Sequence, residues 1–195
     1  AVYEELDFVE DILEHNRDSV VIVDEAYVDF AGKSAMELID RYDNLIVTQT
    51  FSKSRSMAGM RIGFAVSNPD LIRCLNDVKY SFNSYTMSRA ALVCGAEAVK
   101  DRNYFEESIS RIIATRERAK EELKKLGFVF TDSRANFLFA KHPDYDGGQL
   151  FEELKAQKIY VRHWPGERLG QYLRITVGTD EEMDRLFNFL RKKIR

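Results

Sequence analysis

Hydrophobic residues recur along the chain with two different periods. Residues 2–15 carry apolar side chains at helical spacing with acidic residues between them, which predicts an amphipathic helix. Three short apolar runs follow, at residues 20–23, 45–50 and 61–66. Continuous runs of this length are typical of strands that are buried on both faces of a sheet.

Helical patterns separate these runs and dominate the middle of the chain. A short helix is predicted over 34–42, with Ser34 as its cap and Glu37 three residues later, as in a capping box. Three longer helices are predicted over 69–80, 85–100 and 103–126, and Gly127 ends the last of them.

After Gly127 the pattern changes to short strands with two intervening helices. Strands are predicted over 128–131, 136–141, 159–162 and 172–177, and helices over 147–157 and 180–194. This second half predicts a compact α/β unit with a mostly antiparallel sheet.

Together the elements predict an α/β protein with two domains. Residues 1–110 supply only part of a larger open sheet, because three strands with so few helices cannot cover both sheet faces. Residues 111–195 form a smaller C-terminal α/β domain, so the boundary lies inside the helix predicted over 103–126.

Composition narrows the class of protein. The 195 residues are 45% hydrophobic and 31% charged, as in ordinary globular proteins. The net charge of -3 gives no electrostatic reason to expect nucleic acid or an anionic membrane as a partner. Cys74 and Cys94 do not suggest a disulfide framework, which favours a reducing cytoplasm. No secretory signal or bilayer-spanning run is visible.

Acidic, phenolic and amino side chains follow the first two predicted strands. Asp24 and Tyr27 come after the run at 20–23, and Lys53 comes after the run at 45–50. A carboxylate can pair with a protonated pyridine nitrogen, a phenol can donate to a ring oxygen, and an amine can form a Schiff base with an aldehyde. Each residue also has an ordinary explanation, as a turn aspartate, a packed tyrosine and a solvated lysine.

Ser52 and Arg61 add two groups that can hold a phosphate. The serine offers a hydroxyl, the arginine offers a planar guanidinium, and Gly59 lets the backbone approach closely. The whole set suits a phosphorylated aromatic cofactor that bears an aldehyde. No metal site is predicted.

Four segments that contain these and one further candidate residue follow one another in a characteristic order. They are Val23-Asp24-Glu25-Ala26-Tyr27, Thr50-Phe51-Ser52-Lys53-Ser54, Ala58-Gly59-Met60-Arg61-Ile62-Gly63-Phe64 and Leu173-Arg174-Ile175-Thr176-Val177-Gly178-Thr179. In order and spacing they resemble fold-type I pyridoxal-phosphate aminotransferases, in particular the histidinol-phosphate aminotransferase branch. The resemblance implies part of the large-domain sheet of that fold, followed by a complete small domain.

The resemblance also implies a role for each candidate residue. Lys53 would form the Schiff base with pyridoxal 5'-phosphate and shuttle the proton. Asp24 would pair with the pyridinium nitrogen, and Tyr27 would bond the ring oxygen. Ser52 and Arg61 would hold the phosphate.

Arg174 matches the family arginine that binds the anionic end of the substrate, and Arg162 matches a segment near the substrate. A bidentate guanidinium suits this task, although a surface strand arginine is the ordinary alternative. For His163 we expect a packed or solvated side chain, and for Asn136 a role in the turn that starts a strand.

The implied reaction transfers an amino group between an amino-acid-like phosphate ester, histidinol phosphate, and a 2-oxo acid. The resemblance implies a cytoplasmic homodimer that serves histidine and amino-acid biosynthesis. Two alternatives stay open. Related decarboxylases of a phosphorylated amino acid share these motifs, and the chain could instead be a catalytically silent structural or interaction domain.

The resemblance covers only the C-terminal part of the family chain. The preceding part supplies a helix N-terminus that cups the phosphate, an aromatic ring that stacks on the cofactor, and an asparagine beside the ring oxygen. We therefore expect the isolated chain to bind pyridoxal phosphate poorly and to transaminate little or not at all.

Overall fold

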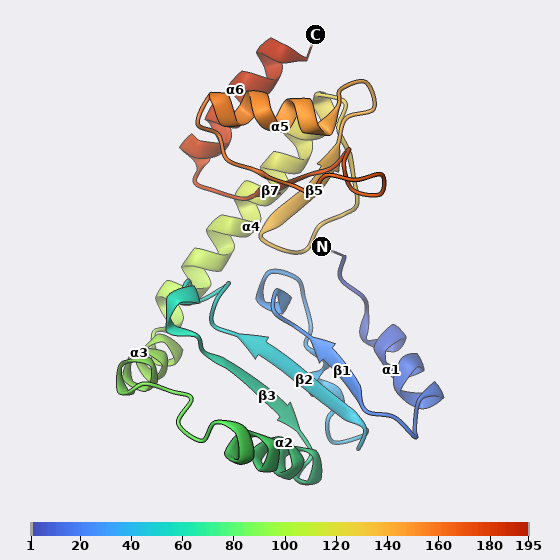
Figure 1. Cartoon of the computed structure of the whole chain (residues 1–195), viewed down its shortest axis with the longest axis vertical. Helices are drawn as coiled ribbons and strands as arrows, with labels where there is room; N and C mark the ends of the chain where they lie inside the picture. The colour runs from blue at the N-terminus through green and yellow to red at the C-terminus, as the bar shows by residue number, and fades with distance from the viewer. Residues whose placement is uncertain (1, 195) are drawn as a thin grey trace. The chain divides into compact units, whose positions relative to one another are not determined.

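A computed structural model describes residues 2–194, which divide into two compact units. The first unit is Tyr3–Glu107, and the second begins at Ser108. The helix α4, Arg102–Lys125, passes from one unit into the other. Figure 1 labels the α-helices and most of the strands of the two units.

The first unit contains three strands and a series of helices. Its elements are α1 Leu6–His15, β1 Val21–Asp24, η1 Val28–Phe30, η2 Ala35–Leu38, β2 Leu45–Thr50, η3 Ala58–Met60, β3 Gly63–Ser67, α2 Pro69–Phe82 and α3 Arg89–Lys100. The strands lie in the order β1-β2-β3, with β1 parallel to β2 and β3 antiparallel to it. Because β1 and β2 are parallel and Asp24 pairs with Thr48, their carboxyl ends meet at one edge of the sheet.

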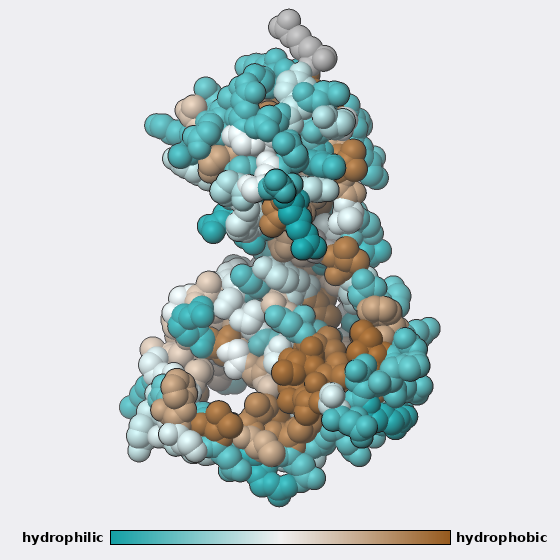
Figure 2. Space-filling view, turned by 45° about the vertical axis from the view of Figure 1, so that its right-hand side comes forward, coloured by the Kyte–Doolittle hydropathy of each residue, from teal (hydrophilic) through white to brown (hydrophobic). Residues whose placement is uncertain are grey.

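One face of this sheet carries the core of the unit. Leu45 and Val47 of β2 pack there with Leu13 of α1 and Leu38 of η2, and all four are buried. The other face is open at β1, where Ile22 is 63% exposed. The expectation that this strand is buried on both faces is therefore wrong. Figure 2 shows hydrophobic atoms gathered on one face of the unit.

The helix predicted over 34–42 is much shorter in the structure. Only η2, Ala35–Leu38, forms, and it is a 3-10 helix. Ser34 does cap it by accepting from the amide of Met36. However, its hydroxyl donates to Glu25, and Glu37 remains exposed, so no reciprocal capping box prolongs the helix.

The second unit is a four-stranded sheet with helices packed on it. Its strands are β4 Val129–Phe130, β5 Phe137–Lys141, β6 Arg162–His163 and β7 Leu173–Thr176, and its helices after α4 are α5 Gly147–Ala156 and α6 Asp180–Lys193. The order is β4-β5-β7-β6, and every neighbouring pair is antiparallel, as the sequence predicted.

The strand expected over 159–162 begins only at Arg162. The preceding residues still complete the end of α5, because the amides of Lys158 and Ile159 donate to the carbonyls of Lys155 and Leu154. Lys158 has a positive φ of 58°, a left-handed conformation that ends a helix.

The core of the second unit is larger than that of the first. It combines α4, α5 and α6 with the sheet through buried residues such as Leu123, Leu154, Leu173 and Phe187. Among residues 2–194 no helix is both long and apolar enough to cross a membrane.

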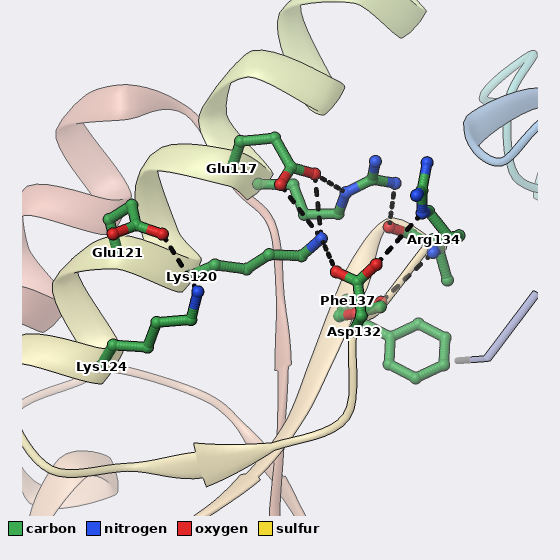
Figure 3. Close-up of polar contacts among 10 residues, drawn as sticks. Glu117, Lys120, Glu121, Lys124, Asp132, Arg134 and Phe137 are labelled. Atoms are coloured by element: carbon green, nitrogen blue, oxygen red, sulfur yellow. Dashed lines mark hydrogen bonds and ion pairs between the residues drawn. The ribbon is translucent and has the colours of Figure 1, made fainter.

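A network of charges crosses from α4 to the loop before β5 (Figure 3). Lys120 is 4% exposed, and its Nζ donates to Asp132 at 2.6 Å and to both oxygens of Glu117. Arg116 is also buried, with Nε on Glu117 and Nη1 on the carbonyl of Ala135. The network satisfies two cations that would be costly to bury alone.

Asp132→Asn is expected to destabilise the second unit in a pH-dependent way. The hydrogen bond from Lys120 lowers the pKa of Asp132 below its ordinary value of 3.8. A carboxyl group whose pKa is lowered in the folded state stabilises the fold at any pH above its ordinary pKa. This stabilisation is lost as the pH falls through the pKa of the folded state. The variant should lose up to about 1 kcal/mol at pH 7, after allowance for the exposure of Asp132. Urea denaturation followed by Trp164, the single tryptophan, measures this.

The difference in free energy of unfolding between variant and wild type should decrease as the pH falls from 7 to below 3.8. Asp144→Asn, at an exposed aspartate of the same unit, should change stability little at either pH. A loss for Asp132→Asn that is independent of pH would contradict this interpretation.

Gly147→Ala is expected to destabilise the second unit by about 2–3 kcal/mol. A Cβ on Gly147 would lie 2.7 Å from backbone atoms of Gly170 and Gln171, which cannot move as a side chain tip would. Gly148→Ala is the matched control, because its Cβ would meet Asp146 Oδ1 at 3.2 Å and alanine favours the helix. Equal stability of the two variants in the same urea assay would refute the argument.

Candidate active site

Lys53 lies on the turn that follows β2. The side chain is half-buried, and its Nζ lies 5.4 Å from the centre of the Tyr27 ring. Tyr27 precedes η1 on the turn that follows β1. Among residues 2–194 Lys53 has no ion-pair partner, so no carboxylate holds its amine. The structure thus brings together the predicted amine and phenol from adjacent strand ends.

Asp24 is the last residue of β1 and is exposed. Its Oδ1 accepts from the amide of Ala26 at 3.0 Å, which fixes the carboxylate in an Asx-type turn. Oδ2 has no partner in the described part of the chain. Side chains alternate along a strand, so Asp24 lies on the open face with Ile22.

Ser52 is held to the end of β2. Its amide donates to Thr50 Oγ1 at 3.1 Å, and the two hydroxyl oxygens lie 2.9 Å apart. The amide of Phe51 donates to the carbonyl of Ile62 at 3.1 Å, so the residue after Arg61 is joined to the residue before Ser52. The two predicted phosphate-binding residues are therefore parts of one loop.

Arg61 adopts a left-handed conformation with φ of 56°, and Ser56 on the same loop has φ of 55°. For residues with a Cβ this conformation costs roughly 1–2 kcal/mol, and such strain concentrates at functional sites. Arg61 is exposed, and its Nη1 donates to the carbonyl of Ala58 at 3.0 Å. Nothing in the sequence pattern indicated either conformation.

Two further contacts hold the turn of Lys53, and sequence reasoning missed both. The hydroxyl of buried Ser54 donates to Asp29, which joins the lysine turn to the tyrosine turn. The guanidinium of Arg55 stacks 3.9 Å from the centre of the Phe105 ring and donates to the carbonyl of Ala98 at 2.6 Å.

Glu25 is a third omission, although it stands inside a quoted motif. It is 9% exposed and accepts three hydrogen bonds, from Ser34, Ala35 and Gln49. The alternation of β1 was the available signal, because it puts Glu25 on the core face, where a carboxylate needs partners.

The two predicted substrate arginines lie in the second unit, opposite each other on neighbouring strands of its sheet. Arg162 of β6 pairs with Arg174 of β7. Their guanidinium carbons lie 5.3 and 5.8 Å from the centre of the Trp164 ring, and that of Arg174 lies 4.9 Å from the Phe137 ring. The Nε of Arg174 is buried and has no hydrogen-bond partner in the described residues. A buried donor is costly when no acceptor pairs with it, and an anion is one such acceptor.

The remaining candidates have structural surroundings. His163 stacks on Phe151, and its Nε2 lies 2.8 Å from the carbonyl of Gly170. Asn136 directly precedes β5, and its carbonyl accepts from the amide of Val177. Among residues 2–194 no group of three His, Cys, Asp or Glu residues could hold a metal ion.

Comparisons with solved structures confirm the fold. A histidinol-phosphate aminotransferase from Sinorhizobium meliloti in complex with pyridoxal-5'-phosphate matches with a TM-score of 0.81 and 26% identity, over 95% of this chain and 52% of that protein. A decarboxylase from Sulfurospirillum multivorans matches with a TM-score of 0.87 and 25% identity, over 100% of this chain and 58% of that one.

Sequence comparisons give the family. A histidinol-phosphate aminotransferase from Pseudomonas putida (strain KT2440) is 52% identical over 185 residues, which are 95% of this chain and 53% of the relative. The chain thus spans about half the length of this relative. The profile of the family "Aminotransferase class I and II" matches residues 3–190. On this evidence the chain belongs to the class I and II aminotransferases.

Proposed function

We propose that this chain forms part of a pyridoxal-phosphate-dependent aminotransferase that transfers an amino group between histidinol phosphate and a 2-oxo acid. The observation that carries the proposal is the amine of Lys53, half-buried 5.4 Å from the Tyr27 ring where β1 and β2 end together. The name of the Pseudomonas putida relative supports the substrate.

The residues at these strand ends fit pyridoxal phosphate. Asp24 has one carboxylate oxygen without a partner in the described chain, so it can pair with a protonated ring nitrogen. Ser52 and the exposed guanidinium of Arg61 would hold the phosphate, and the Tyr27 hydroxyl would bond a ring oxygen. When bound, this cofactor supplies an electron sink for a carbanion.

Lys53 would move the proton. Its amine would accept the proton from the α-carbon of the substrate and return it to the cofactor's carbon within the same half-reaction. Among residues 2–194 no carboxylate pairs with the Lys53 amine, which supports this role because no ion pair holds the amine away from a substrate.

Arg174 and Arg162 would bind the anionic end of the substrate. The partnerless Nε of Arg174 supports this, since a phosphate or carboxylate oxygen would satisfy it. Trp164, in contact with both guanidinium groups, would hold them in place.

We further propose a cytoplasmic homodimer that serves histidine biosynthesis. Cys74 and Cys94 are free and exposed, which fits a reducing compartment. The open face of β1, with exposed Ile22, fits a protein in which more polypeptide covers this sheet.

A decarboxylase is the second candidate, because the protein from Sulfurospirillum multivorans shares the fold with a TM-score of 0.87. The two reactions differ in whether the bond to hydrogen or to the carboxyl carbon breaks at the α-carbon. Product analysis therefore separates them.

A full-length chimera provides the test. In it, the part of the Pseudomonas putida relative that this chain does not match is joined to this chain. With pyridoxal phosphate, histidinol phosphate and 2-oxoglutarate, the chimera should form glutamate and an oxo product without carbon dioxide. Carbon dioxide release from a phosphorylated amino acid would favour the decarboxylase, and no reaction with either substrate would overturn the proposal.

A further inference from the structure

We infer that Glu25 is a positioning residue that fixes the turns of Tyr27 and Lys53 relative to each other. The inference rests on the proposed function for the meaning of that geometry. Glu25 stands between Asp24 and Tyr27 in sequence, yet its carboxylate is buried whereas Asp24 is exposed.

The alternation of side chains explains where Glu25 lies. Asp24 and Ile22 occupy the open face of β1, so Glu25 lies on the core face. The backbone amide of Glu25 continues the parallel ladder by donating to the carbonyl of Thr48 at 2.8 Å. Gln49, the next residue of β2, therefore falls on the same face beside Glu25.

Three donors converge on the two oxygens of the carboxylate. Oε1 accepts from the amide of Ala35 at 2.6 Å, and Oε2 accepts from Ser34 Oγ at 2.6 Å and from Gln49 Nε2 at 2.8 Å. All three contacts need an acceptor, and an ionised carboxylate offers only acceptors. An amide in its place would turn an NH₂ group toward at least one of these donors.

These bonds tie the start of η2 to the ends of β1 and β2, which the sheet already joins to each other. Ser34 and Ala35 begin η2, Gln49 lies near the end of β2, and Glu25 begins the turn after β1. Lys53 follows Gln49 by four residues.

A second bond, from Ser54 to Asp29, joins the same two turns farther along. The tyrosine turn is therefore anchored on both sides of Tyr27, by Glu25 before it and by Asp29 after it.

The carboxylate is better suited to orientation than to stability. Buried charged groups add little net stability compared with apolar side chains of similar size, but their hydrogen bonds are directional. A misplacement of about 1 Å at a reacting group can cost about 100-fold in rate. We therefore expect the loss of Glu25, which leaves three donors without their acceptor, to weaken cofactor binding and turnover in addition to stability.

The test uses the full-length chimera with Glu25→Ala, Glu25→Gln and Gln49→Ala. Glu25→Ala should raise the Kd of the apo-protein for pyridoxal phosphate, measured by equilibrium dialysis, by about 10–100-fold. Glu25→Gln and Gln49→Ala should raise it less, by roughly 3–10-fold, because some of the hydrogen bonds survive. Glu37→Gln, at an exposed glutamate of η2, is the matched control and should bind like wild type.

Amide hydrogen exchange of the apo-protein gives a readout that does not involve the cofactor. Residues 25–31 should exchange faster in Glu25→Ala than in wild type, at a temperature where both are folded. Wild-type Kd and wild-type exchange in Glu25→Ala would overturn the inference. If that variant does not fold, the same result in Gln49→Ala would overturn it.

Failure of the proposed function would look different. A wild-type chimera that does not bind pyridoxal phosphate would refute the function, whereas the exchange of residues 25–31 would still report on Glu25. A wild-type chimera that binds, with Glu25→Ala matching it in both Kd and exchange, would refute only the positioning role.

Discussion

Lys53→Ala in the full-length chimera is expected to reduce amino transfer by at least about 10³-fold. The alanine removes both the nucleophile that would join the cofactor's aldehyde and the base that would move the substrate's proton. Both roles belong to the one amine that lies 5.4 Å from the centre of the Tyr27 ring. Initial rates with histidinol phosphate and 2-oxoglutarate measure the loss.

Chemical trapping adds a measurement independent of turnover. Borohydride reduction of wild type with pyridoxal phosphate should label the peptide containing Lys53, and Lys53→Ala should remove that label. Lys33→Ala, at an exposed lysine of the same unit, should keep both rate and label. More than a tenth of the wild-type rate in Lys53→Ala, or a label elsewhere, would contradict the assignment.

The regular elements could be predicted well because their patterns are local. The strand expected over 45–50 is β2, Leu45–Thr50, and the helix expected over 103–126 is α4, Arg102–Lys125. The errors occur where tertiary contacts compete with local pattern. Ser34 donates its hydroxyl to Glu25 while it caps η2, and only this 3-10 helix forms where an α-helix was predicted. The exposure of Ile22 depends on which elements lie against β1, and this cannot be predicted from a short apolar run of the sequence.

For the candidate site too, the residue types could be predicted from the sequence but their spatial arrangement could not. The sequence order singled out the amine, the phenol and the carboxylate as candidates, because each lies at or just after the end of a strand. It could not give the 5.4 Å approach of Lys53 to Tyr27, which depends on the parallel pairing of β1 and β2. The bond from Ser54 to Asp29 spans 25 positions of the chain and leaves no local signal.

Arg174→Lys in the full-length chimera is expected to raise the KM for histidinol phosphate by about 10–100-fold. Lysine keeps the charge but loses the planar fork and the Nε donor that has no partner in the described residues. Because the proposed acceptor, 2-oxoglutarate, also carries a carboxylate, its KM should rise as well. The Kd for pyridoxal phosphate should stay within about twofold, since Arg174 is assigned to the substrate alone.

The substrate's phosphate provides the internal control. Histidinol without phosphate should react slowly with wild type and equally slowly with Arg174→Lys, because neither can use the missing anion. Arg168→Lys, at an exposed arginine of the same unit, should leave every constant unchanged. The fluorescence spectrum of Trp164, whose ring lies next to the Arg174 guanidinium, checks that the variant is folded. An unchanged KM for histidinol phosphate in folded Arg174→Lys would mean that the buried Nε serves the sheet and not the substrate.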